Sequence, residues 1–209
     1  MFTIPVFIII FIIFIVWTQY EMKKTSKKNK EIEEAFLARE EEANHAPKQD
    51  ISNLELLSFD ENDIPMPPEG MFTDEDDITT YIRELKNLIK KPMIDLSEFS
   101  NTDLKLKYGV ANFTTLSEYD ENYSSFLLLL TNLARGYARR ELYELSEKTY
   151  KYALSCGSIK LHDYIGLAEV YLASDRPQEI NALIDEIEEN EITRKEGIIN
   201  ELKKVLAKY

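Results

Sequence analysis

The segment from Met1 to Tyr20 constrains this chain more than any other part of it. It reads MFTIPVFIIIFIIFIVWTQY, and the first charged side chain is Glu21. A helix needs about 20 such residues to cross roughly 30 Å of hydrocarbon. A cleavable signal peptide is the competing interpretation, but it needs a basic start and small residues at a cleavage site, and this segment has neither. The sequence therefore predicts a transmembrane helix over residues 1–20.

The charges around this segment predict its orientation. Nothing basic except the terminal amine precedes it, whereas five lysines follow it closely. Loops rich in Lys and Arg favour the cytoplasmic side. We therefore expect a single-pass protein of the cell membrane, with the N-terminus outside, the C-terminal domain cytoplasmic, and the lipid bilayer as a partner through residues 1–20. The lysines are Lys23, Lys24, Lys27, Lys28 and Lys30.

Residues 21–45 contain no Gly or Pro and are rich in Lys, Glu and Ala, which favours a charged helical stalk. Ile32, Phe36 and Ala43 form a thin apolar stripe along it. Arg39 interrupts the stripe, and two turns are fewer than the three or four heptads typical of a coiled coil. A solvated spacer is therefore expected rather than a dimerisation rod.

Residues 46–72 have the composition of a Pro-rich linker, and Pro47 is expected to end the stalk helix. Within the linker, the strip from Leu54 to Met66 is too apolar for a free tether. Short apolar strips often belong to a neighbouring core. The strip is expected to lie extended against the chain's own helices, and a partner-binding peptide is the alternative.

The predicted fold class is all-α, because no segment shows sustained alternation of apolar and polar residues. Residues 73–209 are expected to form one helical domain, which Thr73 and Asp76 can cap at its start. Thr193 and Glu196 form a capping box for the final helix. Shorter helical pieces are expected at 101–108, closed by Gly109, and at 112–119.

The C-terminal third of the chain repeats itself, because the pattern of residues 127–160 recurs over residues 161–194. This period predicts one pair of antiparallel helices in each range. Small residues let the paired helices approach, and aromatic ones fill the gap between pairs. The first set of matched residues is Leu130, Leu133, Ala134, Tyr137, Ser146, Tyr150 and Ala153. The second set is Tyr164, Leu167, Ala168, Tyr171, Ile180, Ile184 and Ile187.

This pattern resembles the tetratricopeptide repeat (TPR) over about a third of the chain. It departs from that family where Ser146 and Ile180 replace a small Ala and where Ser158 stands in place of a common Pro. Two units are also fewer than solenoids normally need, so flanking helices must cap them. More loosely, residues 101–109 and 115–120 resemble segments of uncharacterised single-pass bacterial membrane proteins with a similar layout.

In tetratricopeptide proteins the first helix of each pair lines a concave surface, and the resemblance implies a partner-binding set in this chain. Two of its members are arginines, which suit a carboxylate or an acidic peptide. Ordinary solvated charges are the alternative. The Lys and Asn combination of carboxylate-clamp members is absent. The set is Leu128, Thr131, Arg135, Arg139, His162, Ile165 and Glu169.

Composition argues against other chemistries. The formal charge of −13 disfavours a nucleic-acid surface, and a single Cys with 2 His leaves little for disulfides or metals. His162 and Asp163 are consecutive, so they point to different faces of a helix and do not make a base with its orienting carboxylate. No Gly-rich phosphate loop or zinc-protease motif occurs. We therefore predict no catalytic residue, cofactor, metal or small-molecule substrate.

Together these features predict a membrane-anchored, non-catalytic adaptor or scaffold for another protein, whose identity is unknown. One alternative is an accessory subunit of a membrane complex that contacts its partners through the transmembrane helix. Another is a membrane-bound enzyme of unknown class that uses the irregular stretch at residues 93–125. Such an enzyme would need a cluster of titratable groups with shifted pKa values.

Overall fold

The computed structural model describes residues 3–190 and 195–208, and this part of the chain is all-α, which confirms the predicted fold class. The only β-type pairing in it is a single antiparallel bridge between Leu57 and Met93. The helices are α1 (Thr3–Asn44), α2 (Asp77–Leu88), α3 (Asn101–Tyr108), α4 (Phe113–Arg139), α5 (Tyr143–Ser155), α6 (Leu161–Ala173), α7 (Gln178–Glu189) and α8 (Lys195–Leu206).

The chain divides into two compact units. The first contains residues 1–54 and 97–115, and the second contains residues 55–96 and 116–209. This division differs from the predicted single domain over 73–209, because residues 97–115 group with the N-terminal part. The difference arises from contacts between α1 and α3, which no periodic pattern in the sequence predicts.

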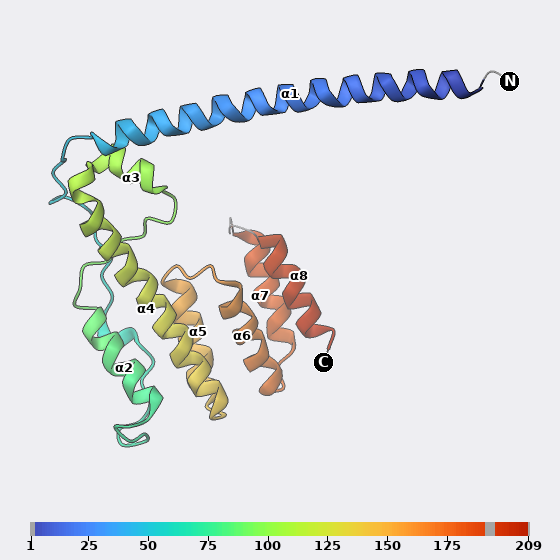
Figure 1. Cartoon of the computed structure of the whole chain (residues 1–209). Coiled ribbons are helices and arrows are strands. Elements are labelled where there is room, and N and C mark those ends of the chain that lie inside the picture. Colours follow the sequence, from blue (N-terminus) through green and yellow to red (C-terminus); the bar gives the residue numbers. More distant parts are fainter. Residues whose placement is uncertain (1–2, 191–194, 209) are drawn as a thin grey trace. The chain divides into compact units, whose positions relative to one another are not determined.

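The helix α1 runs without interruption from Thr3 to Asn44 (Figure 1). All the apolar side chains from Ile8 to Trp17 are exposed. Within the part of the chain that the structure describes, no helix combines the length and the apolar character needed to cross a membrane. The predicted span over 1–20 falls partly outside that part, because residues 1–2 and the side chains of residues 3–7 are not described. The transmembrane helix therefore stays a prediction.

Polar contacts with α3 hold the C-terminal end of α1 in the first compact unit. The Arg39 guanidinium donates to the Asp103 carboxylate at 2.6 Å, and the Thr102 hydroxyl donates to the carboxylate of Glu40. Ala43, on the same side of α1, is completely buried. These contacts tie together parts of the chain that are far apart in sequence.

A glycine lets the chain after α1 cross the end of α3. Gly109 ends α3 with a φ of +85°, and a Cβ at this position would lie 2.3 Å from the carbonyl oxygen of Pro47. The side-chain amide of Asn112 then donates to the carbonyls of Tyr108 and Gln49, both at 2.7 Å. Only glycine combines this φ with such a close approach.

The part of the apolar strip from Phe59 to Met66 lies against the second compact unit's own helices. The ring of Phe59 stacks on Phe126 of α4 with centroids 4.3 Å apart. Ile64 is buried in the same core, and the Tyr137 hydroxyl donates to the carbonyl of Pro65 at 3.1 Å. This part of the strip therefore covers α4 of its own chain, as the first of the two sequence interpretations expected. Leu56 and Leu57, earlier in the same strip, are 45% and 38% exposed.

The helix α4 is longer than the piece predicted at 112–119 and continues to Arg139. The helical turns between residue 119 and residue 127, which the sequence did not predict as helix, contain Tyr123 and Phe126, and both side chains are buried. Farther along α4, Gly136 provides space for Ile78 of α2, because a Cβ there would lie 2.5 Å from the Ile78 side chain. Tertiary packing therefore makes one helix of the stretch that the sequence divided.

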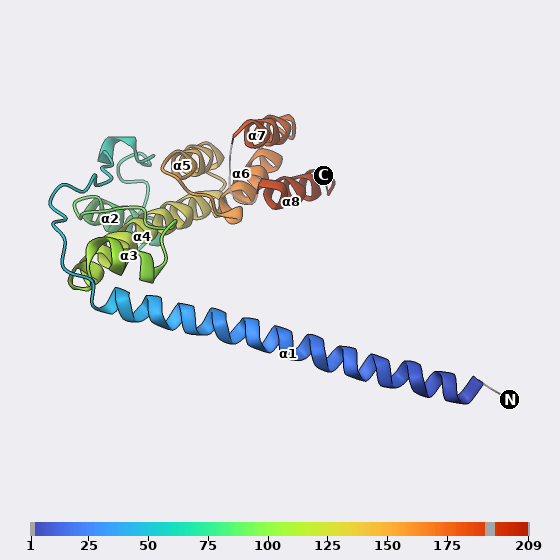
Figure 2. The ribbon, with the colours of Figure 1, turned by 90° about the horizontal axis from the view of Figure 1, so that it is seen from above.

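The elements from α4 to α8 repeat with the period of the sequence. α4 ends at Arg139 and α6 ends at Ala173, while α5 and α7 end at Ser155 and Glu189. α6 begins at Leu161 and α8 begins at Lys195. Viewed from above, α5 and α7 lie in one row, and α6 and α8 lie in a second row (Figure 2). The predicted cap at Thr193 lies outside the described residues.

The turns inside the two helix pairs repeat as well. Glu141 and Asp175, which are one period apart, have positive φ angles of 59° and 57°. After each first helix, the same type of hydrogen bond closes the turn, to the carbonyl of Tyr137 in one pair and of Tyr171 in the other. The fourteen matched positions of the sequence period are all buried in these pairs. The structure therefore repeats in its turns as well as in its apolar positions.

Candidate functional site

An open groove between α4, α5 and α6 brings together five of the seven predicted partner-binding residues. Its volume is about 560 Å³, and it lies entirely within the second compact unit. The two arginines come from α4 and the other three residues from α6. The five residues are Arg135, Arg139, His162, Ile165 and Glu169.

The other two predicted residues lie outside the groove. Leu128 is 51% exposed on α4 but does not line it. Thr131 is only 3% exposed, and its hydroxyl lies 2.7 Å from Oδ1 of Asp163. The expectation that Thr131 faces a partner is thus corrected, because the start of α6 covers its side of α4.

Asp163 is a buried carboxylate that organises one end of the site. It is completely buried, and the hydroxyls of Thr131 and Ser158 both donate to its carboxylate. These bonds join α4, the loop after α5 and the first turn of α6. The preceding residue, His162, points outward and is exposed at the groove. The two neighbours therefore have different roles, one in folding and one on the surface.

Tyr150 and Gly166 form a tight contact inside the groove, and the sequence did not mark either as a site residue. Tyr150 is 2% exposed, and a Cβ on Gly166 would lie 2.3 Å from its hydroxyl oxygen. Burial raises the pKa of Tyr150, and the guanidinium of Arg135, which hydrogen-bonds the hydroxyl, partly offsets this rise. A glycine within a helical period is a signal of close approach that could have identified the pair.

The two arginines of the groove differ in their partners. Arg139 forms an exposed ion pair with Asp77 of α2, with Nη2 and Oδ2 3.0 Å apart. Arg135 is exposed and contacts Tyr150, and no carboxylate of the described residues is paired with it. A planar guanidinium that is exposed and lacks an acidic partner is suited to bidentate capture of a carboxylate. Arg135 is therefore the residue of this groove best placed to bind an acidic group.

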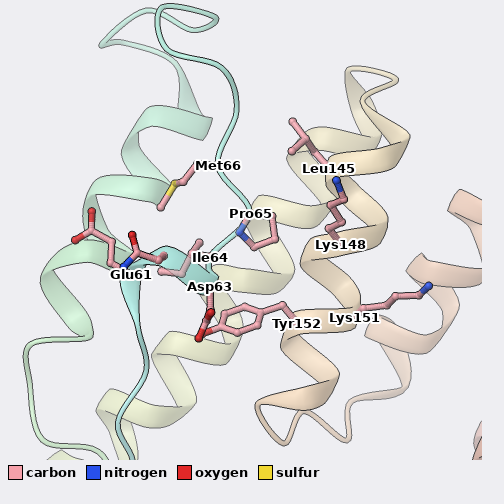
Figure 3. A pocket seen from close by; sticks show the side chains of 10 residues that line it. Glu61, Asp63, Ile64, Pro65, Met66, Leu145, Lys148, Lys151 and Tyr152 are labelled. Carbon is pink, nitrogen blue, oxygen red and sulfur yellow. The ribbon is translucent and has the colours of Figure 1, made fainter.

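A second hollow lies between the segment 61–66 and α5. Lys148, Lys151 and Tyr152 of α5 line it, and Figure 3 shows the Tyr152 ring reaching toward Asp63 while the Lys151 side chain points away from the segment 61–66. Both lysines already pair within α5, Lys148 with Glu144 at 2.6 Å and Lys151 with Glu147 at 2.7 Å. Its cationic groups are thus less available to a ligand than Arg135 is.

Burial and ion pairing explain the shifted pKa values of Glu147 and Cys156 in the second compact unit. Burial alone would raise the pKa of Glu147, but hydrogen bonds from Arg176 and Lys151 outweigh it and lower that pKa. Burial raises the pKa of the Cys156 thiol, whereas a nucleophilic cysteine needs a lowered one. No group of three or more His, Cys, Asp or Glu residues in the described ranges could hold a metal ion.

Comparisons of the chain with protein-family models, with curated proteins and with solved structures found no match. Its function is therefore inferred from the groove and from the sequence.

Proposed function

We propose that this chain is a membrane-anchored, non-catalytic adaptor whose helical-repeat domain captures an acidic segment of another protein at the cytoplasmic face. The observation that carries the proposal is the groove with Arg135 exposed at it. Ile165 lines the same groove and adds an apolar surface, and protein interfaces combine an apolar centre with a polar rim. The groove is open to the surface, so a segment of a partner protein can enter it.

Repetition of the turns supports the proposal that residues 127–160 and 161–194 are tetratricopeptide-like units. In a repeat fold each unit buries its apolar face against the next. The helix α8, which begins one period after α6, then acts as the cap that two units require. In this arrangement the first helices of successive pairs share one surface, and the groove lies on it.

The exposed apolar part of α1 supports the proposal of an anchor. Full burial of a large apolar side chain is worth about 1.5–3 kcal/mol, and ten such residues in succession, Ile8–Trp17, are exposed. A helix that is apolar on all its faces requires either a protein core or a bilayer around it. The lysines that follow it favour a cytoplasmic location for the rest of the chain.

The groove is tested by replacing Arg135 with glutamate in the full-length chain. After crosslinking and pull-down from native membranes, the Arg135→Glu variant should lose a protein that the unchanged chain captures, because the replacement repels an acidic segment. Arg83→Glu is the matched control, since Arg83 is exposed on α2 outside the groove. Equal capture by both variants would exclude the groove as the binding site.

The anchor and its orientation are tested with single cysteines in a Cys156→Ser background. A cysteine at Lys30 should be shielded from a membrane-impermeant maleimide in intact cells and should react after lysis. A cysteine at Thr3, at the other end of the predicted span, should react in intact cells. Ready labelling of the Lys30→Cys chain in intact cells would overturn the cytoplasmic assignment.

A further inference from the structure

An uncharged stripe continues along α1 beyond the apolar segment. Met22, Asn29 and Phe36 are spaced seven residues apart, and Thr25 and Ile32 have the same spacing. Residues at these offsets of three and four lie on one face of a helix. All five are exposed, with Met22, Ile32 and Phe36 at 64%, 57% and 58%. We call these five residues the α1 stripe.

The opposite face of α1 carries the charges that pair within the chain. Lys27 and Glu31 lie 3.8 Å apart, and Lys30 and Glu34 lie 3.7 Å apart. These four residues all occupy positions away from the α1 stripe. The charge pattern therefore gives this part of the helix one charged face and one face without charge, as in a coiled coil.

The C-terminal continuation of the same face already has an occupant. Arg39, Glu40 and Ala43 follow the α1 stripe on this side of the helix, and α3 of the same chain covers them. Arg39, which interrupts the apolar pattern in the sequence, is thus bound to Asp103. The open part of this face ends at Phe36, where the α3 contact begins.

We infer that, contrary to the expectation of a solvated spacer, the α1 stripe pairs with the same stripe of a second copy of this chain, in a short parallel two-stranded coiled coil. A parallel pair brings Lys28 of one copy beside Glu33 of the other, because these residues flank the stripe five positions apart. Neither residue forms an ion pair inside the chain within the described ranges. Lys28 and Glu33 are therefore available to pair between the two copies.

Two further features fit a second copy as the occupant. Asn29 stands among the seven-residue positions, where a single Asn favours a two-stranded, in-register coiled coil. A hollow on this side of the helix offers space for a side chain of the second copy, and its lining is Glu21, Met22, Thr25, Ser26, Asn29, Lys30 and Glu33. This inference concerns α1 alone and does not depend on the groove between α4 and α6.

The test is site-directed crosslinking of the full-length chain in intact cells with a short, membrane-permeant bismaleimide. All variants carry Cys156→Ser, so each has one thiol. Asn29→Cys and Ile32→Cys should give a product of twice the 24.4 kDa chain mass. Lys27→Cys and Glu34→Cys, on the opposite face, should give little of it. Equal dimer yields from both faces, no dimer at all, or a product of another mass would each overturn the inference.

A charge exchange tests the register. Adding Lys28→Glu to the Ile32→Cys chain should lower the dimer yield by about threefold to tenfold, because two attractive contacts become repulsive. Adding Glu33→Lys to that variant should restore the yield. Lys27→Glu is the matched control on the outward face and should leave the yield unchanged. A loss that Glu33→Lys does not reverse would contradict the parallel register.

Discussion

Replacing Gly166 by alanine is expected to destabilise the second compact unit, and the geometry indicates by how much. The new Cβ would lie 2.3 Å from the hydroxyl oxygen, 2.4 Å from Cζ and 2.9 Å from Cε1 of Tyr150. These are atoms of a rigid ring that is buried at 2% exposure, so the ring cannot turn away at low cost. Overpacking of a core costs about 1–3 kcal/mol, and contact with three ring atoms places this case near the upper limit.

The gain from removing a glycine in a helix is smaller than this cost. Alanine stabilises a helix interior by about 1 kcal/mol relative to glycine, which leaves a net loss of about 2 kcal/mol for Gly166→Ala. Gly197→Ala in α8 is the matched control, because no atom lies within 4 Å of its added Cβ. That control should be stabilising by up to about 1 kcal/mol. Gly136→Ala should fall between them, since only the flexible end of Ile78 is too close.

The three variants are compared by thermal unfolding of the full-length chain, followed by the near-ultraviolet circular dichroism of its tyrosines. At about 2–4 °C per kcal/mol for a domain of this size, Gly166→Ala should lower Tm by about 4–8 °C and Gly197→Ala should raise it by about 2–4 °C. An increase in Tm for Gly166→Ala, equal to that of Gly197→Ala, would refute the close approach of Tyr150 to α6.

Three more predictions concern packing, a buried polar contact and pH. Ala168→Leu should cost about 1–3 kcal/mol, because Ala168 is completely buried, whereas Ala182→Leu on the exposed face of α7 should be nearly neutral in urea denaturation. Thr131→Val should lower the free energy of unfolding by about 1–3 kcal/mol, because the buried Asp163 carboxylate loses a hydrogen-bond donor. Thr149→Val is the control and should cost less, because the Thr149 hydroxyl bonds the Leu145 carbonyl. Equal destabilisation by the two variants would contradict the role of Thr131 as a partner of Asp163. Burial raises the pKa of Tyr123 to about 12, so the hydroxyl loses its proton at lower pH in the unfolded chain than in the folded one. The Tm should therefore fall as the pH rises from about 10 to 12. Tyr123→Phe should make this fall smaller.

The helices of the second compact unit were predictable because their signals are local. Residues such as Leu133, Ala134 and Tyr137 recur one period later, and a helix buries residues at these spacings wherever it packs. Five groove residues followed from the resemblance to tetratricopeptide repeats, which implies that the first helix of each pair lines one surface. The resemblance misplaced Thr131, because the environment of this residue depends on Asp163, which lies in the next helix pair.

The remaining features depend on contacts between distant parts of the chain. Docking of α3 on α1 is set by polar partners, such as Glu40 with Thr102, which have no periodicity in the sequence. The length of α4 depends on Phe126, which is buried under Phe59 of a segment that lacks regular structure. Single glycines do give a local signal at such points, as Gly109 does where the chain crosses the end of α3.

The α1–α3 contact also sets an order of assembly during synthesis. Helices α5 to α8 contact their neighbours along the chain, so each pair can form as soon as it leaves the ribosome. Arg39 and Glu40 must wait for Asp103 and Thr102, which are 64 and 62 residues later. At about 5–20 residues per second, this delay is roughly 3–12 s. During that time the end of α1 has emerged without its cover, and its dense glutamates, Glu40, Glu41 and Glu42, keep this nascent segment hydrated until α3 arrives.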